Sequence, residues 1–125
     1  MWKTIIYVAT GSAIGGVGRF LLQQFIQKRA DSLFPYGTLF VNILGCFIIG
    51  IVAGLADKGN LLSPQGRIFL AAGFCGGFTT FSSFISENHS MLRNGELLNT
   101  FTYMSVSIVI GLAATALGVL LIKNL

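Results

Sequence analysis

The stretch GFCGGFTTFSSF, residues 73–84, decides how the rest of the chain is interpreted. It lies inside an apolar segment, residues 68–85, that is about as long as the ~20 residues a helix needs to cross a bilayer. Yet it contains three glycines, two threonines and two serines. Glycine weakens a helix interior, and a hydroxyl in hydrocarbon needs a partner. Non-helical backbone at membrane depth is tolerated only where protein buries it or where it lines a wet cavity. The stretch is therefore predicted to build an ion site that the other segments position.

The composition around this stretch is that of an integral membrane protein. Of 125 residues, 54% are hydrophobic and 10% are charged, whereas a soluble domain of this size covers its core with far more polar surface. The formal charge is +4, but the basic residues form no cluster or stripe, so nucleic-acid binding is not expected. A single four-helix transmembrane domain, all-α, is predicted over residues 1–125.

Four apolar segments predict four transmembrane helices, at residues 4–26, 37–56, 67–86 and 98–122. The first follows a lysine as a signal peptide would, but it continues past the usual apolar length and contains Arg19, which indicates a retained membrane helix. A short polar link, residues 87–96, is expected between the third and fourth segments. Because the number of segments is even, both termini are predicted to lie on the same side of the membrane.

Basic residues give almost no signal for the orientation of these helices. Four are expected on the side of the termini and three on the other side (Lys3, Lys58, Arg67 and Lys123 against Lys28, Arg29 and Arg93), and orientation follows the asymmetry of Lys and Arg. The chain is thus expected to insert both ways and to pair with an inverted copy of itself. Three pairs of glycines four residues apart are expected to let helices approach closely: Gly11 and Gly15, Gly50 and Gly54, and Gly73 and Gly77. Four short helices are too few to enclose a polar pathway, so a homodimer is predicted.

Polar side chains inside the second and fourth segments suggest the lining of a pathway. Thr38 and Asn42 are four residues apart and therefore share one helix face. Asn42 either bonds a neighbouring helix or lines a pathway as a donor, and we favour the pathway. Tyr103, Ser107 and Gly111 recur at the same spacing on the fourth segment and extend a polar line along it.

Phe78, Phe81 and Phe84 recur at three-residue spacing and are predicted to crowd one side of the third helix. Such a stripe ordinarily packs in a core or faces lipid. Here hydroxyl groups are interleaved with the rings, on Thr79, Thr80, Ser82 and Ser83. A phenyl ring has a positive edge, so ring edges beside hydroxyl and amide donors offer an anion a resting place without a formal positive charge. Weak, multiple contacts of this kind suit conduction.

Charged residues near the segment ends have several interpretations. Arg19 attracts anions towards a vestibule, pairs with a carboxylate, or extends towards the membrane interface. Glu87 faces the mouth of a pathway or marks the interface. The middle of each segment lacks the Asp or Glu that a proton- or sodium-coupled cation carrier uses. The sequence has no nucleophile–base pair, phosphate-binding loop or metal cluster, so an enzyme is not expected.

Three motifs resemble the small fluoride channels of bacteria, the Fluc or CrcB family: GFCGGFTTFSSF at 73–84, VNILGCF at 41–47 and GGVGRF at 15–20. The resemblance covers essentially the whole chain, and the TTFSSF block after a double glycine is its most specific part. It implies passive export of cytoplasmic fluoride across the bacterial cytoplasmic (inner) membrane, which confers fluoride resistance. It also implies two pores in an inverted, dual-topology homodimer, a break in the third helix and a central structural sodium ion.

The resemblance assigns roles to individual residues. Asn42, Phe81 and Phe84 match the asparagine and phenylalanines of the fluoride pathway, and Tyr103 and Ser107 match polar positions along it. The predicted pathway also includes the hydroxyls of Thr38, Thr80, Ser82 and Ser83. Arg19 and Glu87 match charged positions near the vestibules, and Gly76 and Thr79 match the backbone carbonyls that hold sodium. The chain departs from the pattern at Gly111, where some relatives carry a hydroxyl, and at Ser83, where threonine is common.

Two other functions fit a small four-helix membrane protein. A small multidrug-type exporter also forms inverted dimers, but it depends on a glutamate in its first segment, where this chain has Arg19 and no acid. A non-transporting packing subunit would conduct no ion by itself. The partners expected are fluoride, the lipid bilayer and a second copy of the chain, with no organic cofactor.

Overall fold

The computed structural model describes residues 1–59 and 61–125, and the regular structure of these residues is helical. The elements are α1 (Trp2–Ala30), α2 (Tyr36–Asp57), α3 (Pro64–Arg67), the π-helix η1 (Ile68–Cys75), α4 (Gly76–Phe78), α5 (Phe81–Arg93) and α6 (Leu97–Lys123). Four spans are long and apolar enough to cross a membrane: α1, α2, α6 and the span Pro64–Arg93, which α3, η1, α4 and α5 form together. The prediction of four membrane-spanning helical segments is confirmed, and the chain is a multi-pass membrane protein.

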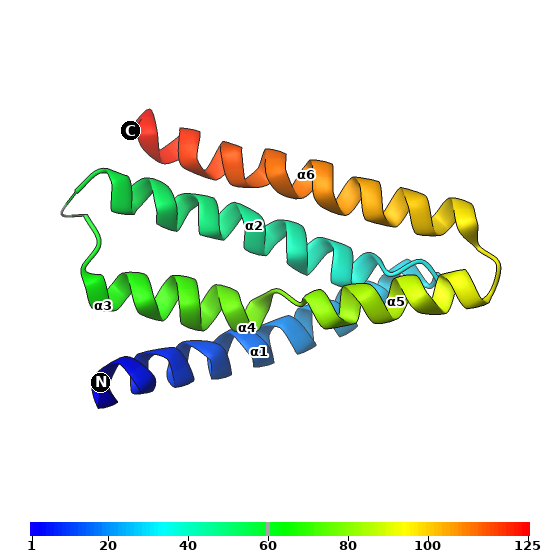
Figure 1. Cartoon of the computed structure of the whole chain (residues 1–125), viewed down its shortest axis with the longest axis horizontal. Helices are drawn as coiled ribbons and strands as arrows, with labels where there is room; N and C mark the ends of the chain where they lie inside the picture. The colour runs from blue at the N-terminus through cyan, green and yellow to red at the C-terminus, as the bar shows by residue number, and fades with distance from the viewer. Residues whose placement is uncertain (60) are drawn as a thin grey trace.

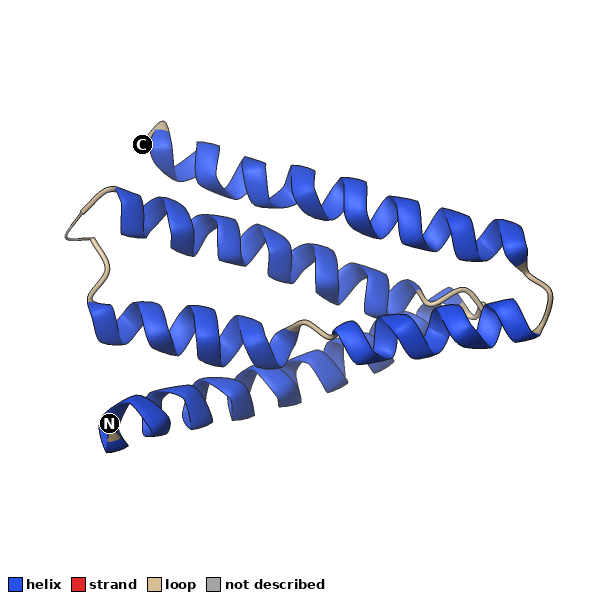
Figure 2. Cartoon of the chain, viewed as in Figure 1, coloured by secondary structure: helices blue, strands red, loops and turns tan. Residues whose placement is uncertain are grey.

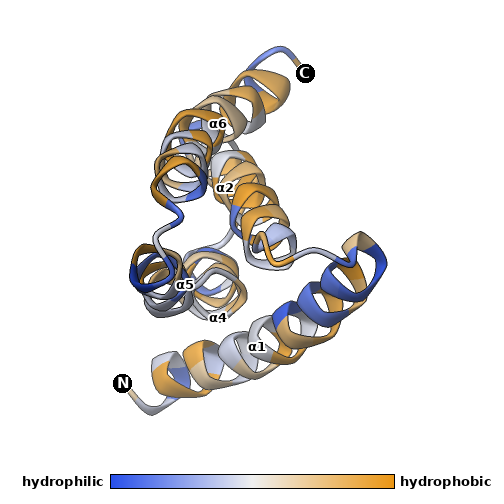
Figure 3. Cartoon of the chain, turned by 90° about the vertical axis from the view of Figure 1, so that its right-hand side faces the viewer, coloured by the Kyte–Doolittle hydropathy of each residue, from blue (hydrophilic) through white to orange (hydrophobic). Residues whose placement is uncertain are grey.

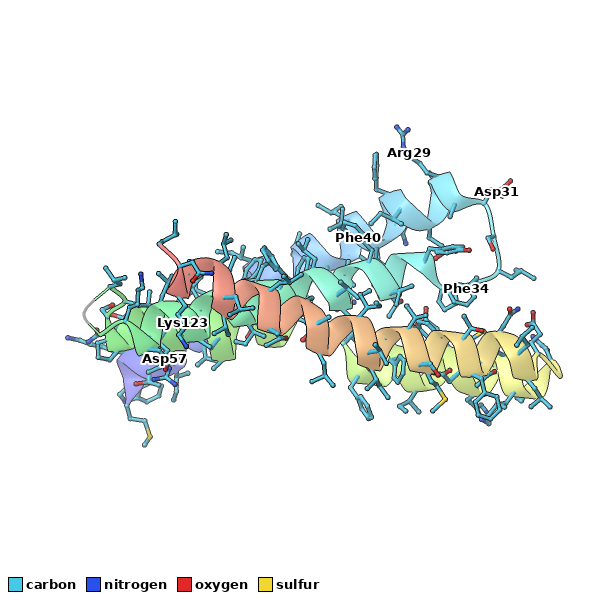
Figure 4. The ribbon with its side chains drawn as sticks, turned by 90° about the horizontal axis from the view of Figure 1, so that it is seen from above. Arg29, Asp31, Phe34, Phe40, Asp57 and Lys123 are labelled. Carbon is cyan, nitrogen blue, oxygen red and sulfur yellow. The ribbon has the colours of Figure 1, made fainter. Side chains whose placement is uncertain are left out.

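The four spans run along the long axis of the molecule and are joined by links at their ends (Figures 1 and 2). α2 packs along α6, and α1 packs against η1 and α4. α1 is inclined to the other spans (Figure 3). Both chain termini lie at the same end, as predicted (Figure 1). Asp57 and Lys123 lie together near that end, and Arg29 and Asp31 lie towards the other (Figure 4).

Glycines allow the spans to approach closely. A Cβ atom at Gly11 would lie 2.8 Å from the backbone nitrogen of Phe74, and one at Gly77 would lie 3.0 Å from the Cα of Ser12. Nonbonded heavy atoms normally stay about 3.5 Å or more apart, so only glycine permits this approach of α1 to η1 and α4. Gly118 likewise permits the close approach of α6 to the backbone of α2. The predicted role of the paired glycines in helix packing is confirmed.

Many large apolar side chains face outwards from the spans. They include Val17, Phe20, Phe101, Val109 and Leu112, each more than half exposed in the single chain. Figure 3 shows hydrophobic residues along much of α2 and α6. An apolar surface of this extent is what a lipid-facing or partner-facing helix bundle presents.

The third span is longer than predicted, because the polar link expected at residues 87–96 is mostly helical. α5 continues to Arg93, and residues 94–96 alone form the link. This part of α5 is amphipathic: Asn88 is buried inside the bundle, whereas His89, which was expected in the loop, is exposed on the helix. The helix ends before Gly95, whose φ of 75° is a conformation that stops helices. The prediction of a loop was wrong because polar residues there cover an exposed helix face.

Candidate functional site

Two residues, Thr79 and Thr80, adopt extended backbone angles between α4 and α5. Their φ and ψ values are −92° and 157°, and −147° and 115°, and Figure 2 shows the short non-helical connection there. The hydroxyl oxygen of Thr80 accepts a hydrogen bond from the Ser83 nitrogen at 3.2 Å, and so caps α5. The double glycine of α4 stabilises helix weakly, and a capping threonine starts a new one. The local sequence therefore favours a short non-helical connection at this point.

Side chains from two other spans pair with the backbone around these residues. Asn42 of α2 accepts a hydrogen bond from the Thr80 nitrogen at 2.8 Å and donates through Nδ2 to the Thr80 carbonyl at 3.2 Å. Arg19 of α1 donates through Nε to the Gly77 carbonyl at 3.1 Å. That carbonyl belongs to the last turn of a helix, where intrahelical partners are lacking. The irregular backbone thus has the protein partners that it needs at membrane depth.

Thr79 and Thr80 border a groove of about 490 Å³. Its walls carry the amide of Asn42 and the hydroxyls of Thr80 and Ser107, together with the rings of Phe81 and Phe84. The centroids of the two rings are 6.0 Å apart, and the rings are tilted by 37° to each other. The residues that line this groove are uncharged. The groove can therefore offer amide and hydroxyl donors and ring edges to an anion without a formal positive charge.

Two polar groups in the groove keep hydrogen-bonding capacity. The hydroxyl oxygen of Ser107 is buried and has no hydrogen-bond partner within residues 1–59 and 61–125. A buried polar group without a partner costs about 1–3 kcal/mol, so this hydroxyl favours a bound ligand. The bond from Asn42 to the Thr80 carbonyl uses one of the two hydrogens on Nδ2. The amide still has a second hydrogen to donate.

A second set of polar side chains connects all four spans, and we call it the Glu87 network (Gln23, Thr38, Glu87 and Tyr103). Glu87 of α5 accepts hydrogen bonds from the hydroxyl of Thr38 in α2 at 2.8 Å and from that of Tyr103 in α6 at 3.0 Å. Gln23 of α1 donates through Nε2 to the Thr38 oxygen at 3.0 Å. Thr38 is 1% exposed and Tyr103 is 0% exposed. Each oxygen of this half-buried carboxylate therefore accepts one hydrogen bond from a buried hydroxyl.

The Glu87 network borders a cleft of about 640 Å³. The cleft is lined from α1 by Arg19, Gln23, Gln24 and Lys28 and from α5 by Glu87. It lies at the end of the bundle opposite the termini, beside the links that join α1 to α2 and α5 to α6 (Figure 1). Arg19 lines the cleft and also contacts Gly77, so it lies between the cleft and the extended residues.

The structure divides the predicted site residues among these places. Most of the predicted pathway and sodium residues line the groove: Asn42, Gly76, Thr79, Thr80, Phe81, Phe84 and Ser107. Arg19 and Glu87 line the cleft, while Thr38 and Tyr103 are buried in the Glu87 network. Ser82 and Ser83 lie in the first turn of α5, exposed and half-buried, and do not line the groove.

The phenylalanine stripe is not on one helix. Phe78 ends α4, where it is buried and stacked on Phe74 with ring centroids 5.3 Å apart. Phe81 and Phe84 lie in α5, beyond the extended residues. Phe81 is 75% exposed, whereas Phe84 is 9% exposed and packs on Tyr103 at 5.0 Å. The prediction that three rings crowd one side of a helix was wrong, because it assumed helical geometry through residues 79 and 80.

Two glutamines of α1 hold positions that were not predicted from the sequence. Gln23 belongs to the Glu87 network, and Gln27 holds the link between α1 and α2. The Gln27 amide donates to the carbonyls of Ser32 and Phe34 at 2.7 and 3.0 Å and accepts from the Gly37 nitrogen at 3.0 Å. Their four-residue spacing places both on one helix face, and this was the signal available in the sequence.

Known proteins resemble this chain over nearly its whole length. The model of the family described as CrcB-like protein, camphor resistance (CrcB), matches residues 6–119. A protein of Flavobacterium psychrophilum named fluoride-specific ion channel FluC is 43% identical, over 98% of this chain and 99% of its own. Proteins with the same name from Leptospira interrogans and Azobacteroides pseudotrichonymphae are 42% and 44% identical. They match 98% and 97% of this chain and 96% and 97% of their own chains.

Proposed function

This chain belongs to the family of CrcB-like proteins, and from that premise we propose that it is a fluoride-specific ion channel. The observation that carries the proposal is the similarity, over almost the full length, to relatives with that name. The chain acts as a passive conductor and not as an enzyme. It exports cytoplasmic fluoride across the bacterial cytoplasmic membrane, and this export confers fluoride resistance.

We place the fluoride pathway in the groove. Fluoride is a small anion that accepts hydrogen bonds strongly, so an amide, a hydroxyl and ring edges can replace part of its water. The free hydrogen of Asn42, the hydroxyl of Ser107 and the edges of Phe81 and Phe84 supply these contacts. Chloride is larger and fits the same donors poorly. Because none of these groups carries a formal charge, fluoride is bound weakly enough to leave.

The cleft is the proposed vestibule of this pathway. The guanidinium of Arg19 and the ammonium of Lys28 line it, and basic groups at the mouth of a narrow path raise the local concentration of anions. The carboxylate of Glu87 opposes this effect. Its two hydrogen bonds to Thr38 and Tyr103 hold it among buried donors.

We propose that a second, inverted copy of the chain completes the pore, giving a dual-topology homodimer with two pathways. Phe81 lines the groove and is 75% exposed in the single chain, so its outer face is available to a partner copy. The near-equal distribution of basic residues supports insertion in both orientations. A protease-protection assay on a C-terminal tag in sealed vesicles should find the tag in two populations of similar size. A tag that is entirely protected or entirely cleaved would contradict the inverted arrangement.

We further propose that the carbonyls of Gly76 and Thr79 hold a structural sodium ion at the dimer centre, where Thr79–Thr80 break the third membrane helix. In a continuous helix the Thr80 nitrogen would donate to the Gly76 carbonyl, but here it donates to Asn42. Gly76 is also exposed. Carbonyls at the end of a helix carry partial negative charge, so this backbone fits a cation that would supply positive charge beside the groove. Exchanging sodium for a large organic cation during purification should abolish dimer activity, and restored sodium should recover it.

Fluoride efflux from liposomes that contain only the purified chain tests the channel function. An electrode records fluoride release after the membrane potential is cancelled with an ionophore, and a parallel preparation loaded with chloride serves as the control. Fast fluoride release with chloride retained is expected. If folded protein released neither anion, the chain would instead be a packing subunit.

A further inference from the structure

We propose that Gln23 is a positioning residue, which directs the hydroxyl of Thr38 towards Glu87 and thereby keeps the carboxylate of Glu87 from obstructing anions in the cleft. The inference rests on the proposed channel function and concerns the same cleft.

The direction of the Thr38 hydrogen follows from its two neighbours. A threonine hydroxyl has one hydrogen to donate and two lone pairs. Gln23 Nε2 lies 3.0 Å from the Thr38 oxygen, and Glu87 Oε2 lies 2.8 Å from it. The carboxylate accepts only, so the Thr38 hydrogen is donated to Glu87. The amide hydrogen of Gln23 occupies a lone pair of Thr38 and prevents the hydroxyl from donating towards α1 instead.

The surroundings hold Gln23 in this arrangement. Thr38 is 1% exposed, so water does not compete for its hydroxyl. Gly37 allows the stem of Gln23 to pack against α2, since a Cβ atom there would lie 3.0 Å from Gln23 Cγ. The other amide atom, Oε1, is buried with no hydrogen-bond partner among the described residues. A half-turn of the amide would place Oε1 against Thr38, and Thr38 would then donate to Gln23 and not to Glu87.

The consequence for ion passage lies in the cleft that these residues share. Arg19, Gln23 and Glu87 all line it. With two donors, the carboxylate is held at the buried hydroxyls of Thr38 and Tyr103. With one donor removed, it is free to turn into the cleft, where it repels fluoride and attracts the guanidinium of Arg19. Gln23 therefore influences the passage of fluoride indirectly. It acts on the Glu87 carboxylate by way of the Thr38 hydroxyl.

Gln23→Glu imposes the reversed arrangement, because an ionised carboxylate at this position accepts from Thr38 and cannot donate to it. We expect fluoride efflux to slow by about tenfold, the factor for one hydrogen bond to a charged group. Gln24→Glu is the matched control. Gln24 is exposed and lines the same cleft, so its replacement measures the effect of added negative charge alone. Gln23→Met has no amide to donate to Thr38 and no carboxylate to accept from it. Its rate of fluoride efflux should lie between those of Gln23→Glu and Gln24→Glu.

A double-mutant cycle separates positioning from charge. In the Thr38→Val background the hydroxyl is gone, so Gln23→Glu should slow efflux no more than Gln24→Glu does. In the Thr38→Ser background, which keeps the hydroxyl, the larger loss should return. The same tenfold loss with and without the hydroxyl would overturn the proposal, and so would equal losses for Gln23→Glu and Gln24→Glu.

The experiment distinguishes failure of this proposal from failure of the channel function. If the unaltered protein releases no fluoride, the channel function is wrong, and positioning for ion passage falls with it. The contact itself is tested separately by the thermal unfolding midpoints of the same variants in detergent, where Gln23→Met and Thr38→Val should be non-additive. Additive midpoints would exclude the coupling between Gln23 and Thr38. Size-exclusion profiles establish that each variant is folded.

Discussion

Replacing Asn42 separates the two roles that the structure gives to its amide. In the unaltered protein, Asn42 accepts from the Thr80 nitrogen at 2.8 Å and donates to the Thr80 carbonyl at 3.2 Å. Asn42→Asp keeps an oxygen that can accept from the nitrogen, but it loses the donor to the carbonyl. Leaving one polar group without its partner costs about 1–3 kcal/mol, which is small beside the roughly 5–15 kcal/mol that stabilises a typical fold. Asn42→Ala leaves both Thr80 groups unpaired. It should therefore destabilise the protein more than aspartate does.

The expected effect on conduction has the opposite order. A carboxylate at residue 42 places a full negative charge in an uncharged groove. Its repulsion of fluoride at about 4 Å is worth roughly 4 kcal/mol at an effective dielectric constant of about 20. This corresponds to about a thousandfold slower passage. Alanine removes a donor and adds no charge, so its loss of flux should be far smaller.

Two measurements on the same three proteins test this reasoning. Fluoride efflux from liposomes should rank the unaltered protein first, Asn42→Ala second and Asn42→Asp last. Thermal unfolding in detergent should rank the unaltered protein first, Asn42→Asp second and Asn42→Ala last. If efflux followed the order of stability, Asn42 would serve only to hold the Thr80 backbone, and the amide would have no place in the pathway.

Three further substitutions test the structure, and two of them have matched controls in the chain. Phe81→Ile should reduce fluoride efflux at least about tenfold, because it removes a ring that lines the groove. Phe101→Ile, at a residue 68% exposed, should leave efflux normal, and equal efflux in both would remove the ring from the mechanism. Ser107→Ala should slow efflux yet stabilise the protein by about 1 kcal/mol, because it removes a buried hydroxyl that has no partner in the described chain; a loss of stability would show that this hydroxyl is paired. Gly77→Ala should lower stability by about 2 kcal/mol or more, because its Cβ would lie 2.5 Å from the Ser12 carbonyl oxygen. Gly16→Ala, with nothing within 4 Å of its Cβ, should cost far less. Similar thermal unfolding midpoints for the two variants would refute the close approach of α1 and α4.

The features that the sequence predicts well are those encoded locally. Apolar runs give the four spans, and glycines four residues apart give the contact of α1 with η1 and α4. The residue types of the groove were also predictable, since Asn42, Phe81 and Ser107 stand out as polar or aromatic groups within apolar segments. Each of these signals needs only a short window of sequence and the physics of a bilayer.

The features that the sequence does not predict depend on the partners of each side chain. Asn42 and Thr80 are 38 residues apart in sequence, and nothing in either segment specifies that the amide pairs with this backbone. The direction of Phe78 relative to Phe81 depends on dihedral angles at two threonines. Gln23 was overlooked because its hydrogen-bond partner, Thr38, lies on another span and in turn donates to a carboxylate from a third span. Contacts of this kind can be identified only when the four spans are placed relative to one another.

The membership of the Glu87 network has a consequence for biosynthesis. Each of its four residues comes from a different span, and the spans leave the ribosome in order. Gln23 and Thr38 can meet while synthesis is still under way, and Glu87 gains its first donor when the third span arrives. Its second donor, Tyr103, is in the last span to be made. A nascent chain that stops before α6 therefore keeps a half-paired carboxylate within the membrane, which distinguishes unfinished chains from finished ones.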